Sequence, residues 1–136
     1  MAARMRHIAL LVTDPEASAK FFEEAFGMKR AGPAGRGLYM SDGVINIALL
    51  KVNPEKEKAG IFHFGMWVDD LDEAMKAVEK AGGSYMSGRP DGLPNTFYEV
   101  KCQGPDGILF DLTHSGWRGA VKEVVPAPAE VKEPAE

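Results

Sequence analysis

The chain has 136 residues, 45% of them hydrophobic and 26% charged, which is the composition of one globular domain rather than of a disordered or fibrous chain. Its 16 Lys and Arg against 20 Asp and Glu give a net charge of −4, which excludes a strongly basic nucleic-acid-binding surface. No apolar run is long enough for a membrane helix, the N-terminus lacks a signal-peptide pattern, and the single Cys102 cannot form an intrachain disulfide. We therefore expect a cytoplasmic protein without nucleic-acid or membrane partners.

The first half of the chain is predicted to fold as a strand, a helix and a hairpin. The helix is expected to begin at Asp14-Pro15, since Asp caps a helix and Pro fits its first turn, and to end at Gly27. Asp42-Gly43 is a dipeptide typical of a two-residue hairpin loop. The expected elements are a strand at 7–12, a helix at 15–26, and strands at 38–41 and 44–50.

The second half is predicted to repeat this order. Asp69-Asp70 precedes a helical pattern that ends at Gly82-Gly83, and the turn residues of 104–107 separate two later apolar runs. The expected elements are a strand at 61–68, a helix at 71–81, and strands at 84–86, 97–102 and 108–113.

The two halves also share sequence. When His7 is placed on His63, an offset of 56 residues, seven of the twenty-one positions from 7 to 27 are identical without a gap. Average residue usage would give about one or two such identities by chance. This repeat predicts one domain over 1–124 built from two modules, 5–53 and 60–117, and a Pro/Ala/Glu-rich tail at 125–136.

Strand periodicity predicts where the repeated histidines point. Side chains of a strand alternate between its two faces, so Ile8, Leu10 and Val12 are expected to pack on the helix and His7 to face away from it. The same alternation in the later strands places His63 and Asp111 on this opposite face. Two imidazoles and one carboxylate that converge form a set suited to a divalent metal ion.

These features resemble the vicinal oxygen chelate superfamily. The resemblance rests on the duplicated unit with a His in each first strand, on the helix start DPEASAKFF at 14–22, and on GPDGILFD at 104–111. The superfamily includes glyoxalase I, fosfomycin- and bleomycin-resistance proteins, methylmalonyl-CoA epimerase and ring-cleaving dioxygenases. The resemblance implies an α+β fold in which two tandem βαβββ modules form a curved mixed sheet around a metal cleft. It also implies a homodimer, with a site that is either contained in one chain or built from His7 of one subunit and His63 and Asp111 of the other.

The resemblance assigns the metal ligands by position. His7 and His63 match the ligands that open the two units, and Asp111 stands where the superfamily usually has Glu. Asn46 is the position expected to match the Glu that is the fourth ligand of glyoxalase I, and it is also a candidate substrate-binding residue. Two His and one carboxylate favour Fe²⁺ or Mn²⁺, while Zn²⁺ and Ni²⁺ are compatible with the same groups.

Other residues are candidates for binding a small-molecule substrate. The aromatic residues are expected to line the site or to hydrogen-bond substrate, and Arg can hold an anionic group with paired donors. Trp117 and Arg118 follow a glycine and are candidates for a contact with a neighbouring subunit. The candidate site residues are Tyr98 as a catalytic hydrogen bonder, with Tyr39, Trp67 and Arg89 as substrate contacts.

Three functions remain open at this point. The first, and the favoured one, is a non-haem metal oxygenase that acts on a catechol-like substrate with two adjacent oxygens. The second is a glyoxalase-type lyase or isomerase, which Asn46 disfavours because a metal-bound Glu base is absent there. The third is a non-catalytic protein that binds a small molecule or drug, which Asp111 in place of Glu favours.

Overall fold

The computed structural model describes residues 2–88 and 99–124, and these form two modules of the same βαβββ order. The first module contains β1 (Ala3–Val12), α1 (Pro15–Phe26), β2 (Lys29–Ala34), β3 (Gly37–Ser41) and β4 (Asn46–Lys51). The second contains β5 (Gly60–Val68), α2 (Leu71–Lys80), β6 (Ser84–Ser87), β7 (Val100–Gln103), the short 3₁₀ helix η1 (Pro105–Gly107) and β8 (Leu109–Thr113).

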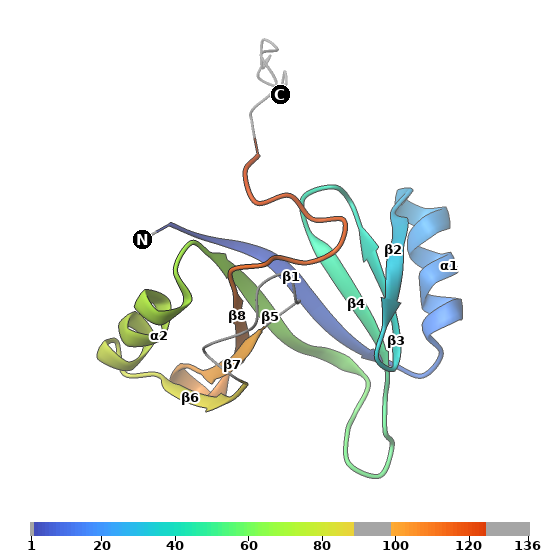
Figure 1. Cartoon of the computed structure of the whole chain (residues 1–136). Coiled ribbons are helices and arrows are strands. Elements are labelled where there is room, and N and C mark those ends of the chain that lie inside the picture. Colours follow the sequence, from blue (N-terminus) through green and yellow to red (C-terminus); the bar gives the residue numbers. More distant parts are fainter. Residues whose placement is uncertain (1, 89–98, 125–136) are drawn as a thin grey trace, which may run out of the picture.

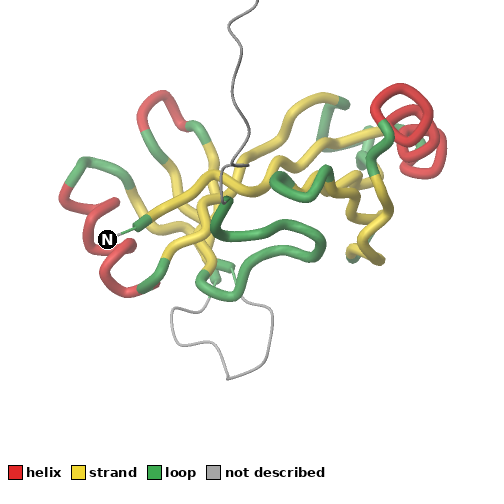
Figure 2. The backbone as a smooth tube through the Cα atoms, turned by 90° about the horizontal axis from the view of Figure 1, so that it is seen from above, coloured by secondary structure: helices red, strands yellow, loops and turns green. Residues whose placement is uncertain are grey.

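The strands form one curved, mixed sheet in the order β2-β3-β4-β1-β5-β8-β7-β6. Each module contributes one half, and β1 and β5 pair antiparallel at the centre, while the β1–β4 and β5–β8 pairs are parallel. Figures 1 and 2 show α1 and α2 at opposite ends of this sheet. The predicted α+β class and the duplicated βαβββ architecture are confirmed.

The pairing of β1 with β5 follows the sequence repeat. In the register of β1 with β5, His7 lies opposite Gly65 and Ala9 lies opposite His63. The offset that places His7 on His63 also places Ala9 on Gly65, so the two pairs are equivalent to each other. The repeat therefore folds with an approximate two-fold axis between β1 and β5, and this axis brings the two histidines side by side.

Both helices begin as their sequences predict. The carboxylate of Asp14 accepts hydrogen bonds from the backbone N–H groups of the first turn of α1, and Asp70 does the same for α2. Gly27 ends α1 in the left-handed conformation, with φ of 67°, which favours glycine at this position.

Each helix packs on one half of the sheet through a separate apolar cluster. The first cluster joins Ala19 of α1 to the first-module strands, including Leu10 and Val12 of β1. The second cluster joins Leu71 and Ala74 of α2 to the second-module strands. The predicted strand alternation is therefore correct, and the opposite face of the sheet is left for the polar residues.

The structure corrects the sequence prediction in two places of the first module. Residues 29–34 form β2, which is not among the strands expected from the sequence; Pro33 is tolerated in it because β2 lies at the sheet edge. The β3–β4 loop has four residues instead of two, since the Asp42 carboxylate accepts hydrogen bonds from the N–H groups of Val44 and Ile45 and extends the turn.

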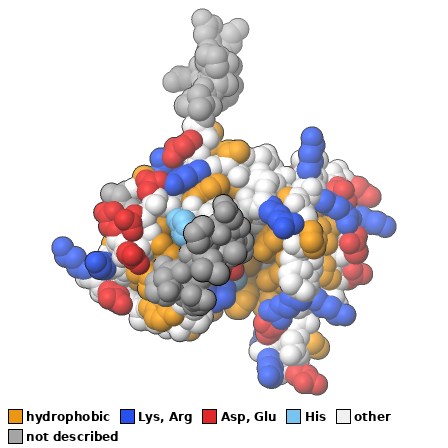
Figure 3. Space-filling model, in the orientation of Figure 1, with side chains coloured by type: hydrophobic (Ala, Val, Ile, Leu, Met, Phe, Trp, Pro, Cys, Tyr) orange, Lys and Arg blue, Asp and Glu red, His pale blue; other side chains and the backbone are white. Residues whose placement is uncertain are grey.

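Figure 3 shows Lys and Arg side chains interspersed with Asp and Glu over the face in view, and hydrophobic side chains between them. Among the described residues, neither helix has the length and apolar character required to cross a membrane.

Candidate metal centre

Three strands at the middle of the sheet each supply one buried group to a common point. His7 comes from β1, His63 from β5 and Asp111 from β8, and their possible ligand atoms all lie within 4.8 Å of one another. Metal–nitrogen and metal–oxygen bonds are about 2.0–2.2 Å long, so small side-chain rotations bring all three onto one ion. All three groups belong to one chain.

His7 is held on both sides of its ring. Its Nδ1 lies 2.9 Å from Oδ1 of Asn46, and the indole of Trp117 stacks on the imidazole with ring centroids 4.7 Å apart and planes within 6°. Burial lowers the pKa of His7 to about 4, although the Asn46 hydrogen bond opposes this change. His7 is therefore neutral at physiological pH, which is the form that binds a metal.

His63 and Asp111 are also buried and lie next to each other. Nε2 of His63 is 2.8 Å from Oδ2 of Asp111, yet this oxygen receives no hydrogen bond from the described residues. The other oxygen, Oδ1, accepts from Nζ of Lys101 at 3.0 Å. Burial alone would raise the pKa of Asp111, but His63 and Lys101 outweigh it and lower the pKa to about 2. Asp111 is therefore an ionised carboxylate whose buried Oδ2 has His63 as a close neighbour but receives no well-formed hydrogen bond from the described residues.

Glu99 is a further acid beside the site that the sequence analysis missed. Its Oε2 accepts a hydrogen bond from Nε1 of Trp117 at 3.3 Å. Burial, and then the nearby charge of Asp111, raises the pKa of Glu99 to about 7. Strand parity puts Glu99 on the same side as Lys101, but only the β7–β8 register of the folded chain shows that Lys101 pairs with Asp111.

Comparison with known proteins agrees with this architecture. Residues 4–112 match the Glyoxalase/Bleomycin resistance protein/Dioxygenase superfamily. The chain belongs to this superfamily. The predicted resemblance is thus confirmed, and most members of the superfamily are metalloenzymes.

Two similar proteins are described without a function. A Bacillus subtilis (strain 168) protein, YwbC, described as uncharacterized, is 28% identical over 127 residues, covering 82% of this chain and 98% of YwbC. A hypothetical protein from Bacillus halodurans C-125 superposes with a TM-score of 0.67 at 18% identity, covering 93% of this chain and 100% of that one.

Two enzymes of known structure share the fold with similar TM-scores. The 2,3-dioxygenase LapB from Pseudomonas sp. KL28 superposes with a TM-score of 0.63 at 22% identity, covering 93% of this chain and 46% of LapB. Methylmalonyl-CoA epimerase from Mycobacterium tuberculosis gives 0.60 at 18% identity, covering 80% of this chain and 85% of the epimerase. The superfamily fold therefore accommodates both oxygenase and epimerase chemistry.

The strand register corrects the expected position of a fourth superfamily ligand. Asp111 lies beside Gly65 in the β5–β8 pair, and the equivalent of Gly65 in the first module is Ala9. In the β1–β4 pair, Ala9 lies beside Ala48, whereas Asn46 lies beside His7. The first-module counterpart of Asp111 is therefore Ala48, two residues beyond the position that the sequence suggested. Its buried methyl group cannot bind a metal, so the carboxylate is present in one module only.

The structure places the remaining predicted site residues at different distances from this centre. The ring of Tyr39 lies edge-on to His7, with centroids 6.4 Å apart, and burial raises the pKa of its hydroxyl. Trp67 instead packs against Gly116, and its Nε1 donates to the carbonyl of His114. Trp117, which the sequence suggested as a contact to another subunit, stacks on His7 of its own chain. Tyr98 and Arg89 lie outside the described residues.

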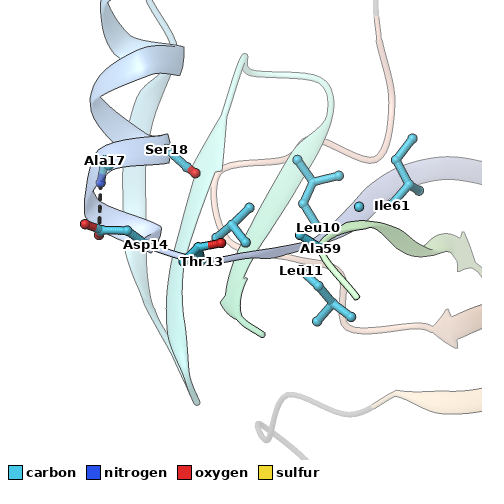
Figure 4. Close-up of a pocket in the computed structure, with 10 residues that line it drawn as sticks. Leu10, Leu11, Thr13, Asp14, Ala17, Ser18, Ala59 and Ile61 are labelled. Carbon is cyan, nitrogen blue, oxygen red and sulfur yellow. Dashed lines mark hydrogen bonds between the residues drawn. The ribbon is translucent and has the colours of Figure 1, made fainter. Parts of the chain in front are cut away.

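A separate pocket of about 600 Å³ lies between the end of β1, the start of α1 and the start of β5. Figure 4 shows that its labelled side chains are mainly apolar and that the carboxylate of Asp14 is hydrogen-bonded to the N–H of Ala17. This carboxylate is already used as the helix cap, so the pocket lacks the converging polar groups found around Asp111.

Proposed function

We propose that the protein is a divalent-metal enzyme whose ion is bound by His7, His63 and Asp111, and that it is a non-haem oxygenase acting on a small molecule with two adjacent oxygens. The observation that carries the proposal is the buried Oδ2 of Asp111, which lacks a hydrogen bond from the described residues and lies 2.8 Å from Nε2 of His63. A buried carboxylate oxygen without a well-formed hydrogen bond is costly, and an ion bound by both groups would satisfy it.

The neighbours of these groups also fit metal binding. Ligating histidines and carboxylates in proteins are usually hydrogen-bonded through their second polar atom. Asn46 contacts His7 in this way, and Lys101 contacts Asp111. Asn46 occupies Nδ1 of His7 and Lys101 occupies Oδ1 of Asp111, which leaves Nε2 and Oδ2 as the atoms for the ion.

The number of ligands favours the oxygenase among the superfamily's reactions. Two histidines and one carboxylate with open positions form the set typical of non-haem Fe²⁺ oxygenases. Ala48, at the position where a fourth ligand would lie, supplies no further protein ligand on the first-module side. A bound ion would supply Lewis acidity toward both substrate oxygens and, as Fe²⁺, reactivity with O₂. Lys101, whose side chain is 44% exposed, would offer its remaining hydrogens to an anionic substrate oxygen.

The experiment begins with elemental analysis of protein purified without added metal, and then measures O₂ consumption with catechols after anaerobic addition of Fe²⁺. We expect about one metal ion per chain in the wild type and loss of both metal and O₂ uptake in His63→Ala and Asp111→Asn. His114→Ala is the matched control, because His114 is exposed and its side chain lies outside the proposed ligand set. Wild-type protein that neither contains nor takes up Fe²⁺, Mn²⁺, Zn²⁺ or Ni²⁺ would refute the proposal.

A lyase or isomerase of the glyoxalase or epimerase kind is the second candidate, and Glu99 favours it. These reactions need a group that accepts a proton from carbon, and a carboxyl with a pKa of about 7 is suited to that task. Bound Zn²⁺ or Ni²⁺, with no O₂ uptake and with exchange of a substrate C–H proton into D₂O that Glu99→Gln abolishes, would identify this function instead.

The subunit arrangement and the location of the protein remain proposals. We propose a cytoplasmic homodimer, as in many superfamily members of this size, with one complete metal centre per chain. Sedimentation equilibrium tests the dimer, and a monomer mass at micromolar concentration would contradict it.

A further inference from the structure

The segment that follows β8, residues 114–124, crosses back over the first module, and we call it the strap. Figure 1 shows it in orange-red, running from the end of β8 across β1 toward the C-terminus. First-module side chains donate hydrogen bonds to backbone carbonyls of the strap: Asn46 to Arg118 at 2.6 Å, Ser41 to Gly119 at 2.7 Å, and Arg6 to Val121 at 2.8 Å.

One of these hydrogen bonds determines how the amide of Asn46 is oriented. The carbonyl of Arg118 can only accept, so the Asn46 atom that contacts it must be the NH₂ group. The amide oxygen then faces Nδ1 of His7. Asn46 is completely buried, so water cannot replace either contact.

The orientation of Asn46 in turn determines the tautomer of His7. An amide oxygen is only an acceptor, so Nδ1 of His7 must carry the proton that it receives. In a neutral imidazole the proton then cannot be on Nε2, which keeps its lone pair. This lone pair is the one that a metal ligand needs.

The strap also holds the plane of the His7 ring. Trp117 is 4% exposed and lies parallel to the imidazole, and a Cβ placed on Gly65 would come within 2.5 Å of its indole. The indole of this strap residue therefore packs against β5 with no room for an added carbon atom at Gly65. Tautomer and orientation of His7 are both fixed by contacts that exist only when the strap is in place.

We infer that the strap is a positioning element of the metal centre: the Arg118 carbonyl orients Asn46, Asn46 selects the Nδ1–H tautomer of His7, and strap docking is thereby coupled to metal binding at Nε2. The inference rests on the proposed function for its metal, but the tautomer relay exists without one. Coupling between two binding events is reciprocal. A bound metal must therefore favour the docked strap by the same factor by which the docked strap increases the affinity for the metal.

The first test uses metal-free protein and the long-range ¹H–¹⁵N spectrum of the histidine rings. We expect protonated Nδ1 and unprotonated Nε2 for His7 in the wild type. Asn46→Leu is expected to lose this preference, whereas Asn46→Asp keeps an acceptor toward His7 and is expected to retain it. Ser41→Ala is the control, because the Ser41 hydroxyl hydrogen-bonds the Gly119 carbonyl of the strap, and its other hydrogen bonds go to the backbone of Gly43 and Ile45 and not to the Asn46 amide or to His7. A wild-type His7 protonated at Nε2, or a fixed Nδ1–H tautomer in Asn46→Leu, would overturn the inference.

The second test measures the coupling with Mn²⁺ or Zn²⁺ and with trypsin. We expect Asn46→Leu to weaken metal binding about 10- to 100-fold, the usual effect of removing such a partner. Saturating metal is expected to slow cleavage after Arg118 and Lys122 in the wild type but not in Asn46→Asp, which cannot donate to the Arg118 carbonyl. If Asn46→Leu does not fold, Asn46→Asp, which preserves size, decides the question.

The outcomes separate this inference from the proposed function. A wild type that binds no metal but shows the Nδ1–H tautomer, lost in Asn46→Leu, refutes the metal enzyme and supports the relay. A wild type that binds metal, with a tautomer and an affinity unchanged in Asn46→Leu, supports the enzyme and overturns the relay. Equal protection of the strap by metal in the wild type and in Asn46→Asp would also overturn it.

Discussion

The packing of Trp117 against the sheet predicts that Gly65→Ala destabilises the protein. Gly65 lies opposite His7 in the β1–β5 pair. A Cβ at this position would be 2.5 Å from Cζ2 of Trp117, 2.6 Å from its Cη2 and 3.0 Å from Cβ of His7. The first two distances are shorter than carbon atoms approach in folded proteins, so the indole must leave its place on His7 or the strand must move.

The size of the effect follows from the cost of overpacking. One extra methyl group in a closely packed site typically costs about 1–3 kcal/mol. For a domain of this length, each kcal/mol lowers the melting temperature by about 4 °C. We therefore expect Gly65→Ala to melt roughly 4–12 °C below the wild type. Gly35→Ala is the control, because no heavy atom lies within 4 Å of a Cβ at that exposed site, and we expect its stability to change by less than about 0.5 kcal/mol.

The assay combines thermal unfolding with tryptophan fluorescence. The chain has two tryptophans, so a Trp67→Phe background isolates the emission of Trp117. We expect a red shift in Gly65→Ala, as the indole moves from its buried position into water, and faster tryptic cleavage of the strap. A Gly65→Ala protein with wild-type stability and unchanged Trp117 emission would refute the packing of this indole against Gly65 of β5.

Four further predictions follow from individual contacts. Cys102 is buried and its burial raises the pKa of the thiol to about 11, so iodoacetamide at pH 8 is expected to label it far more slowly in native than in urea-unfolded protein; equal rates would contradict this. Asp14→Ala removes the α1 cap and is expected to cost about 1 kcal/mol in urea unfolding, while Asp14→Asn, which still accepts, costs less. Arg36 lowers the pKa of Glu57 to about 2, so the stabilisation from this pair is present at neutral pH and is lost as pH falls from about 4.5 toward 2. In Arg36→Gln, NMR titration of the carboxyl groups is expected to show a higher pKa for Glu57 than in the wild type. Ala48→Asp introduces the missing carboxylate of the first module and is expected to tighten Zn²⁺ binding at least about tenfold in chelator competition, whereas neutral Ala48→Asn is not.

The sequence predicted the groups of the candidate site that lie on strands. A period of two and a gapless repeat are enough to place His7, His63 and Asp111 on the face opposite the helices, because neither depends on distant contacts. The capping residues Asp14 and Gly27 predicted α1 to its first and last residues, since each acts on the local backbone alone.

What the sequence left undetermined depends on pairing across the sheet or on irregular backbone. The fourth-ligand position was assigned to Asn46 instead of Ala48 because strand parity alone cannot fix register. Trp117 belongs to a segment without periodicity, so its stacking on His7 depends on the path by which the strap returns to the first module. Parity puts Glu99 on the same side as Lys101, but the register that pairs Lys101 with Asp111 and the burial that raises the pKa of Glu99 are visible only in the folded chain.

The two-fold relation between β1 and β5 has a consequence for regioselectivity. A fully symmetric centre would offer two interchangeable positions to the two oxygens of a chelating substrate. Here Asp111 lies on the second-module side and the methyl group of Ala48 on the first, with Trp117 stacked on His7. Under the proposed function, the two oxygens of a bound substrate would meet chemically different surroundings, which would let the protein distinguish the two ends of a molecule whose reacting groups are alike.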